Sequence, residues 1–488
     1  MQGLDIYKKV YLFKEGFMMG PLQLEKIQKK LQHNVDIVYR TIQNKDTTLH
    51  IIFASNISDT HYISQSVIKP LIETEETQID IFNLQTKILP VSNMGEFTTE
   101  EEAIAYILTG DAVIILPHES KGIFCEVKQY KKRTVETPPS EGVLKGPREG
   151  FTEHVGDNIS MLTKRVKNPK LRIEDVDLKD TCHTKIFLVY LEDRVSKKAL
   201  QYAYDQIEKA KSSYIITARE IENMLESKES TFDTIGHTEK PDIVAARLGE
   251  GRIAIFVDGT PVVITIPFFF FENFQAPDDY YLNKYTVSLL RILRWTAFFI
   301  SIFVLPLYLA LSTYHFSLVP TIFAFRLAVS RAGVPFPIVL EIILMMFFFQ
   351  VLREAGVRLP QAIGQSISTV GALILGDTAV NSGLASNITV LVVALVTISS
   401  FLIPNLYGSI WIWSDILLIF AAFLGIPGLY VGIIIFWTHI ASLESCGYPY
   451  LFPLGTRESY AYKDLILKKE TREMYSPIFY RGGSDERD

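Results

Sequence analysis

The apolar residues of this chain are concentrated in one continuous stretch, from about residue 290 to residue 440. Charged residues make up 21% of the 488 residues, yet the stretch contains few of them. Those it contains are Arg291, Arg294, Arg326, Arg331, Arg353, Arg358, Glu341, Glu354, Asp377 and Asp415. Long apolar runs of this kind predict membrane helices, because a helix satisfies its own backbone hydrogen bonds in lipid.

Each membrane span needs about 20 apolar residues. Residues 295–316, 337–352, 362–380 and 388–404 each supply one such run, and residues 410–440 supply a longer one. The longer run contains Gly425-Ile426-Pro427-Gly428, which predicts either a bent helix or a tight hairpin. Residues 320–333 are short and carry two arginines, so we expect them in the membrane interface. We therefore predict an all-α multi-span membrane domain over residues 285–445, with four to six helices.

The region before the membrane domain is polar from its first residues. The opening MQGLDIYKKVYLFKEG has no apolar core of the kind found in secretory signals. Arg291 and Arg294 precede the first span, and positive charge flanks spans on the cytosolic side. We expect the N-terminal region to be cytosolic, together with a C-terminal tail over residues 446–488.

The N-terminal region contains a weak internal repeat. Residues 49–72 and 185–210 each read as a strand, a polar turn and a helix. Residues 101–127 and 241–267 each read as a helix, a glycine turn and two strands, and Asp258-Gly259 is a hairpin signal. We predict two similar α/β subdomains over residues 20–133 and 159–275. The linker between them, residues 134–158, is rich in proline, glycine and charge.

No enzyme, cofactor or metal site is predicted. The sequence has no HExxH, GxxxxGK[ST] or GxSxG motif, its nine histidines lack ligand spacing, and Cys125, Cys182 and Cys446 are isolated. The net charge of −6, without a basic block, argues against nucleic-acid binding. The linker motif Gly146-Pro147-Arg148-Glu149-Gly150 follows no predicted strand. We favour a structured connector there over an anion site at Arg148.

Small residues follow one face of the segment 362–380. Gly364, Ser368, Gly371 and Leu375 are spaced three or four apart, so a helix places them together. Such a face allows either close packing of helices or a water-filled ion path. Both interpretations stay open, and we name these four residues with Asp377 as candidates for lining a pore.

Two carboxylates lie within the apolar runs. An ionised group at the centre of a span costs about 2.5–3.5 kcal/mol on insertion scales, so it usually serves a function. Glu341 lies close to Pro337 and could instead reach the interface. Asp377 lies deeper in its run.

Several motifs together resemble one known family. They are PPSEGVLKGPREGFTE (138–153), HTEKPD (237–242), EGRIAIFVDGTPVVITIP (250–267), DDYY (278–281), REAGVRLPQAIGQSISTVGALILGDTAV (353–380) and SCGYPYLFP (445–453). In this order they resemble the A subunit of GerA-type spore germinant receptors. The resemblance covers about residues 35–460.

The resemblance implies a protein of the spore inner membrane in a Bacillus- or Clostridium-type bacterium. It implies two partners, a transporter-like B subunit that senses nutrients and a lipoprotein C subunit. It also implies that A subunits assemble into a homo-oligomeric ring with a cation-conducting pore. A nutrient sensed by the partner would then open the ring.

Some positions depart from the family's pattern. Acidic residues are common in the family where this chain has Met346 and Gln350, and the ending ETREMYSPIFYRGG is unusual. These departures keep open a SpoVAF-like accessory channel subunit that supports germination without sensing nutrients. Two further alternatives remain: a stand-alone secondary transporter, for which Gly425-Ile426-Pro427-Gly428 is the one hint, and a scaffold that is merely anchored in the membrane.

Overall fold

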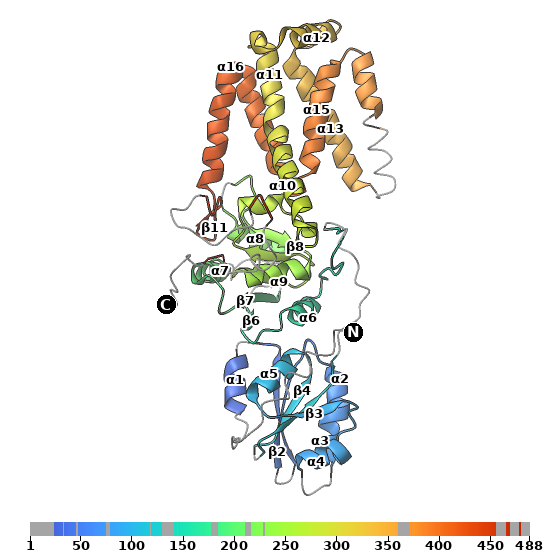
Figure 1. Cartoon of the computed structure of the whole chain (residues 1–488), viewed down its shortest axis with the longest axis vertical. Coiled ribbons are helices and arrows are strands. Elements are labelled where there is room, and N and C mark those ends of the chain that lie inside the picture. The colour runs from blue at the N-terminus through green and yellow to red at the C-terminus, as the bar shows by residue number, and fades with distance from the viewer. Residues whose placement is uncertain are drawn as a thin grey trace.

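The computed structural model stacks two α/β units below a bundle of long helices (Figure 1). The first and second α/β units follow each other along the chain, and the membrane bundle follows the second. The structure describes residues 24–32, 34–44, 47–74, 79–117, 119–128, 141–143, 145–176, 184–209, 216–227, 230–359, 371, 373–454, 465–468 and 478–479.

The first unit is built on a five-stranded antiparallel sheet with the strand order β1-β2-β4-β5-β3. The strands are β1 Ile37–Asn44, β2 Thr47–Ala54, β3 Met94–Phe97, β4 Ala112–Ile115 and β5 Gly122–Cys125. The helical segments are α1 Leu24–Leu31, α2 Thr60–Ile63, η1 Ser64–Ile68, α3 Lys69–Glu73, α4 Ile81–Asn83, η2 Leu84–Ile88 and α5 Glu100–Leu108. Side chains of β2 alternate between two cores: Ile51 belongs to the core with α2 to α3, and Ile52 to the core with α1 and α5.

The second unit repeats this plan. Its strands are β6 Leu171–Asp175, β7 Ile186–Leu191, β8 Gly236–Thr238, β9 Ile253–Val257 and β10 Val263–Ile266. Its helices are α6 Val155–Arg165, α7 Lys197–Lys209, α8 Ala218–Leu225 and α9 Pro241–Gly249. The strand order is β6-β7-β9-β10-β8, again antiparallel throughout. The predicted fold class, two similar α/β subdomains followed by a helical membrane domain, is therefore confirmed.

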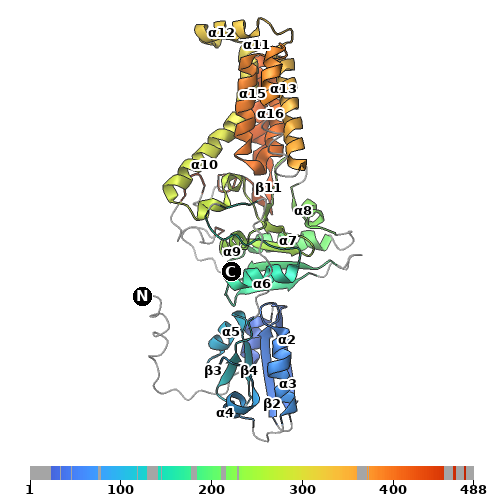
Figure 2. The same cartoon turned by 90° about the vertical axis from the view of Figure 1, so that its right-hand side faces the viewer.

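The membrane bundle begins with one long helix. α10 Lys284–Phe299, the π-helical segment η6 Ile300–Val304 and α11 Leu305–Thr313 follow one another without a break. The remaining segments are η7 Phe316–Leu318, α12 Thr321–Arg331, α13 Ile338–Arg358, a helix over residues 373–381, α15 Asn387–Phe401, η8 Pro404–Leu406 and α16 Tyr407–Ser442. α12 lies across the far end of the bundle (Figure 2).

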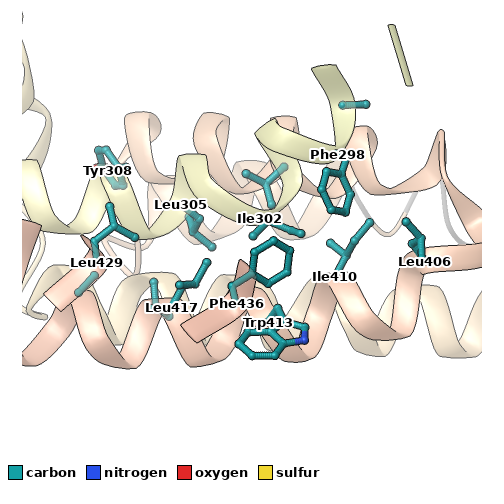
Figure 3. Packing of buried hydrophobic residues seen from close by; sticks show 14 of the residues in the cluster. Phe298, Ile302, Leu305, Tyr308, Leu406, Ile410, Trp413, Leu417, Leu429 and Phe436 are labelled. Atoms are coloured by element: carbon teal, nitrogen blue, oxygen red, sulfur yellow. The ribbon is translucent and has the colours of Figure 1, made fainter. Parts of the chain in front are cut away.

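Two stretches of the described chain are long and apolar enough to cross a membrane. They are Lys284–Thr313 and Pro404–Ser442. In the bundle they pack together, because Phe298, Ile302 and Leu305 of the first face Trp413, Leu417 and Phe436 of the second (Figure 3).

α16 is a helical hairpin. Its turn is Gly425, whose φ of 65° lies in the left-handed region that favours glycine. Two further glycines let the halves approach closely: a Cβ on Gly428 would lie 2.1 Å from the Phe420 carbonyl oxygen, and one on Gly432 would lie 2.6 Å from Leu417 Cδ2. Of the two alternatives that the sequence left open, the hairpin is the one observed.

After the hairpin the chain returns to the second α/β unit. β11 Glu444–Ser445 and β12 Tyr448–Pro449 form a small ladder. Cys446 between them belongs to the core of that unit, and the Ser196 and Tyr448 hydroxyls hydrogen-bond at 2.7 Å. The first part of the predicted tail is therefore packed against folded structure.

Candidate functional site

The chain passes from the second sheet to the membrane bundle through a buried charged cluster, which we call the coupling joint: Asp279, Arg291, Arg294 and Lys468. Asp279 ends up here because η5 Pro277–Tyr280 turns the chain directly before α10. Arg291 and Asp279 are both fully buried, with Arg291 Nε 2.9 Å from Asp279 Oδ2. Arg294, one helical turn further on, donates to the same carboxylate at 2.9 Å.

The remaining member of the coupling joint comes from the C-terminal region. Lys468 Nζ donates to the backbone carbonyl of Asp279 at 2.5 Å and to that of Leu282 at 3.0 Å. Its backbone N–H also donates to Ser288 Oγ on α10 at 3.2 Å. The joint therefore connects η5, α10 and the C-terminal region through buried charged groups. Leaving such a group unpaired would lower the stability of the fold.

The arginines of the joint were expected to flank the first span as positive charges. The structure gives them a different role, because Arg291 is completely buried and Arg294 is largely buried against the same acid. Both guanidinium groups pair with one acid of the fold, Asp279.

The linker motif packs against this region. Gly146 has a φ of +128°, and a Cβ there would lie 2.6 Å from the Tyr281 ring. The Pro147 carbonyl accepts from the fully buried Lys240 Nζ at 2.6 Å, and Tyr281 donates its hydroxyl proton to Asp242. Three separate sequence motifs, at 146–150, 237–242 and 278–281, therefore meet at one place.

Within the linker motif the two charged residues differ. Glu149 pairs with Arg165 on α6, whereas Arg148 is exposed. The observed contacts are those of a structured connector. Glu141, just before the motif, accepts from Thr238 Oγ1 at 2.8 Å and from the Glu239 N–H at 2.9 Å. Burial raises the pKa of Glu141, and these hydrogen bonds oppose the shift.

Aromatic packing completes the attachment of α10. Trp295 stacks on Phe274 with ring centroids 3.8 Å apart, and Phe270 meets Phe298 edge-on at 5.7 Å. Beneath them, Arg252 and Glu272 form a buried ion pair. Charged pairs and rings together attach the first membrane helix to the segment that follows the second sheet.

A polar cavity of about 240 Å³ lies beside the joint. It is lined from the second unit by Glu141, Asp233, His237 and Arg247, and from the bundle by Arg294 and Asn405. Burial raises the pKa of Asp233, and His237 opposes the shift. No group of three or more His, Cys, Asp or Glu side chains is arranged for a metal ion in the described part of the chain.

Glu341 lies at the far end of the bundle and is fully buried. Its Oε1 accepts from Arg331 Nε on α12 at 3.1 Å, and its Oε2 from the Ser386 N–H at 3.1 Å and Thr389 Oγ1 at 2.9 Å. Tyr308 on α11 bonds to Thr389 at 3.0 Å. The carboxylate thereby joins four segments of the bundle.

The structure describes only some of the residues that we named as candidates for lining a pore. Gly364 and Ser368 lie outside the described residues. Gly371 faces α13, because a Cβ there would lie 2.6 Å from Leu352 Cδ2. Leu375 is half-buried, and Asp377 is exposed on the single chain.

Sequence reasoning missed two features. One is the coupling joint, whose signal was DDYY followed by two arginines a helical turn apart; these were interpreted as flanking charges. The other is Asp415, an acid inside the run IWIWSDILLIF, where an ionised group is as costly as at Glu341 or Asp377. Asp415 forms no hydrogen bond or ion pair with any described residue, whereas Glu341 is fully paired.

Comparisons with known proteins agree with the motifs. Residues 25–477 match the family described as "Bacillus/Clostridium GerA spore germination protein". "Spore germination protein KA" of Bacillus subtilis is 35% identical over 449 residues, covering 90% of this chain and 82% of that protein. "Spore germination protein A1" of the same species is 31% identical over 431 residues, covering 87% and 89%.

Among solved structures, the N-terminal domain of the A subunit of the Bacillus megaterium spore germinant receptor GerK3 is similar at 21% identity with a TM-score of 0.38. The similarity covers 52% of this chain and 98% of that domain. The match over residues 25–477 includes both α/β units, the coupling joint and the membrane bundle, and the chain therefore belongs to the GerA family of spore germination proteins.

Proposed function

We propose that this chain is the A subunit of a nutrient-germinant receptor in the spore inner membrane. It acts with a transporter-like B subunit that senses the nutrient and a lipoprotein C subunit. Copies of the chain assemble into a ring that conducts cations when the nutrient is sensed. The observation that carries the proposal is the uninterrupted family match through soluble and membrane parts.

The coupling joint supports a signalling role for the soluble units. A passive anchor needs only a flexible linker before its first span, whereas here α10 is held by buried ion pairs and stacked rings. Movement of the second unit would therefore turn α10 and the helices packed on it. This arrangement favours a coupled channel over the scaffold alternative.

The stand-alone transporter is less well supported. A transporter of that kind uses broken helices around a site near the middle of the membrane. The break at Gly425 lies instead beside Tyr314 and His315, which follow the end of α11, and it forms a hairpin turn. The one hint for this alternative is thus explained by a connection at the end of the bundle.

Within the proposed ring, the segment 362–380 faces the axis. Gly371 packs toward Leu352, while Asp377 is exposed on the single chain and is available to an ion path. We assign Glu341 to holding the bundle together. In this proposed arrangement the two α/β units remain on the cytosolic side. We keep the domain limits that the sequence predicts.

The experiment is cation flux through the purified full-length chain reconstituted in liposomes. A channel passes cations down their gradient without a co-substrate, and the oligomer is seen as a closed ring by electron microscopy. A scaffold gives no flux, whereas a transporter gives saturable flux that depends on a second solute. Either of these two results would refute the proposal.

A second experiment separates a receptor subunit from the SpoVAF-like accessory role. Spores lacking the chain are tested with a panel of single nutrients. A receptor subunit predicts that the response to one group of nutrients is lost. An accessory subunit predicts that the response to all nutrients is slowed.

A further inference from the structure

A small cavity inside the membrane bundle is lined by hydroxyl groups. Its volume is about 40 Å³, and its polar lining is Ser301, Thr397, Ser400, Tyr407, Ser414 and Gln350. These residues come from η6, α13, α15 and α16. Since one water needs about 10–15 Å³ of such volume, the cavity has room for a small ion with a water or two.

Three of the hydroxyls have already donated their protons. Ser301 donates to the Ala297 carbonyl at 2.7 Å, and on α15 Thr397 donates to the Val393 carbonyl at 2.8 Å. Ser400 donates to the Thr397 carbonyl at 2.7 Å. A hydroxyl carries one proton and two lone pairs, so these three oxygens can only accept or coordinate on their remaining side.

Ser414 is different, because its Oγ is buried and has no hydrogen-bond partner among the described residues. The residue is 2% exposed, and it lines the same cavity. Burying a hydroxyl without a partner destabilises the folded chain. A ligand in the cavity would remove that cost.

A mostly apolar groove that contains two acids adjoins the cavity. The groove has a volume of about 570 Å³, shares Met346, Gln350 and Trp411 with the cavity, and is also lined by Glu354 and Asp415. Glu354 pairs with Arg358. Asp415, next to Ser414 in the chain, has no such partner in the described structure, so a negative charge there is unbalanced.

We propose that the cavity binds one monovalent alkali cation. Ser301, Thr397, Ser400 and Ser414 supply oxygen ligands, and Asp415 supplies the balancing negative charge. Hydroxyl oxygens whose protons are already donated elsewhere suit a cation and not an anion. A divalent ion is disfavoured, because such sites usually include carboxylate ligands and no carboxylate lines the cavity itself.

This site belongs to a single subunit. It lies among η6, α13, α15 and α16. Binding there would stabilise the packing of the first membrane helix on the hairpin and so make the bundle sensitive to the cation. The proposed cation site does not depend on whether the chain forms a channel.

Equilibrium binding of radioactive sodium and rubidium to the purified full-length chain in detergent tests the site. We expect saturable binding, and we expect one of the two ions to bind with higher affinity than the other. Ser414→Ala and Thr397→Val should each weaken affinity about ten-fold, because each removes an oxygen ligand of a charged group. Asp415→Asn should weaken it as well.

Two further variants control the measurement. Ser399→Ala removes a buried hydroxyl from the same helix that does not line the cavity, and it should bind like the unmodified chain. Thr397→Ser keeps the oxygen and should retain binding. If Ser414→Ala does not fold, the comparison of Thr397→Val with Thr397→Ser still tests the proposal. Absence of saturable binding, or equal binding by the cavity variants and Ser399→Ala, would mean that the cavity holds water only and would overturn the proposal. The liposome flux assay is scored separately, so failure of one does not imply failure of the other.

Discussion

Arg291, two turns into the helix that leads into the membrane, and Asp279, in the turn before that helix, form a fully buried ion pair at 2.9 Å. Removing one partner of such a pair leaves an uncompensated charge, which typically costs about 3–5 kcal/mol. We expect Arg291→Ala to lower the free energy of unfolding by about this amount, measured by thermal unfolding of the purified chain. Arg358→Ala breaks the exposed pair with Glu354 and should cost under about 1 kcal/mol. Equal effects would contradict the role of the joint.

Glu341 should behave like a buried anchor and not like a pore residue. Glu341→Ala leaves Arg331 and Thr389 without their acceptor, so we expect a loss of about 3–5 kcal/mol and poor recovery of the folded chain. Asp377→Asn, at an exposed position, should change stability by less than about 0.5 kcal/mol. A stable, folded Glu341→Ala protein with altered ion flux would argue instead for a conduction role.

The hairpin of α16 should depend on its glycines. Gly428→Ala places a Cβ 2.1 Å from the Phe420 carbonyl oxygen, a contact that requires the two halves to separate. We expect a loss of about 1–3 kcal/mol in thermal unfolding. Gly408→Ala, in the same helix and with nothing within 4 Å of the added Cβ, should be neutral or stabilising by up to about 1 kcal/mol. If both substitutions were neutral, the close approach of the two halves would be wrong.

Stability of the first α/β unit should depend on pH through Asp36. Burial raises the pKa of this acid from 3.8 to about 6. Between these values the folded chain holds a proton that the unfolded chain has lost, so stability falls as the pH rises through this window. The loss above about pH 6 is at most about 3 kcal/mol, from 1.36 kcal/mol per pKa unit.

Asp36→Asn should remove this dependence and stabilise the unit near neutral pH. The measurement is urea unfolding of the full chain at several pH values, followed by a fluorescent label placed in the first unit. Asp59→Asn is the comparison at another acid of this unit; Asp59 caps α2, and an asparagine caps a helix about as well, so this replacement should change the stability little. An unchanged pH profile for Asp36→Asn would show that Asp36 is not the group responsible.

Variants of the segment 362–380 distinguish a helix that only packs against its neighbours from a helix that lines an ion path. Gly371→Leu should prevent assembly, because the added side chain meets Leu352. Ser368→Leu should leave the complex assembled but block ion release, and Leu375→Ala should leak ions without nutrient. Complex abundance and ion release are measured together in spores. If every variant that loses ion release also loses the complex, and Leu375→Ala does not leak, the segment only packs.

The sequence predicted the two α/β units correctly because their signals are local. The strand, turn and helix order at residues 49–72 and the turn at Asp258-Gly259 depend on neighbours in the chain, and the same order recurs at residues 185–210. The glycine motif at 425–428 likewise marked a break. The sequence could not specify that the break is a hairpin, because a hairpin depends on the contact between Leu417 and Gly432 on the two halves of α16.

The charged residues were harder to interpret from the sequence. Arg291 before an apolar run looks the same whether it contacts lipid headgroups or a buried acid, and only the turn at residues 277–280 brings Asp279 to it. Glu341 and Asp415 look equally isolated in their runs. Their difference depends on partners from other helices, such as Arg331 and Ser386 for Glu341.

The return of residues 444–450 to the second sheet has a topological consequence. Ser445 Oγ donates to the Thr234 carbonyl at 2.6 Å and accepts from the Phe268 N–H at 2.9 Å, so the chain re-enters the unit it left at α10. The membrane bundle is thus an insertion in one folded body, with both ends attached on the same side. Whatever path the chain takes between them, its complete crossings of the bilayer must be even in number. The two α/β units and residues 444–454 therefore share one compartment.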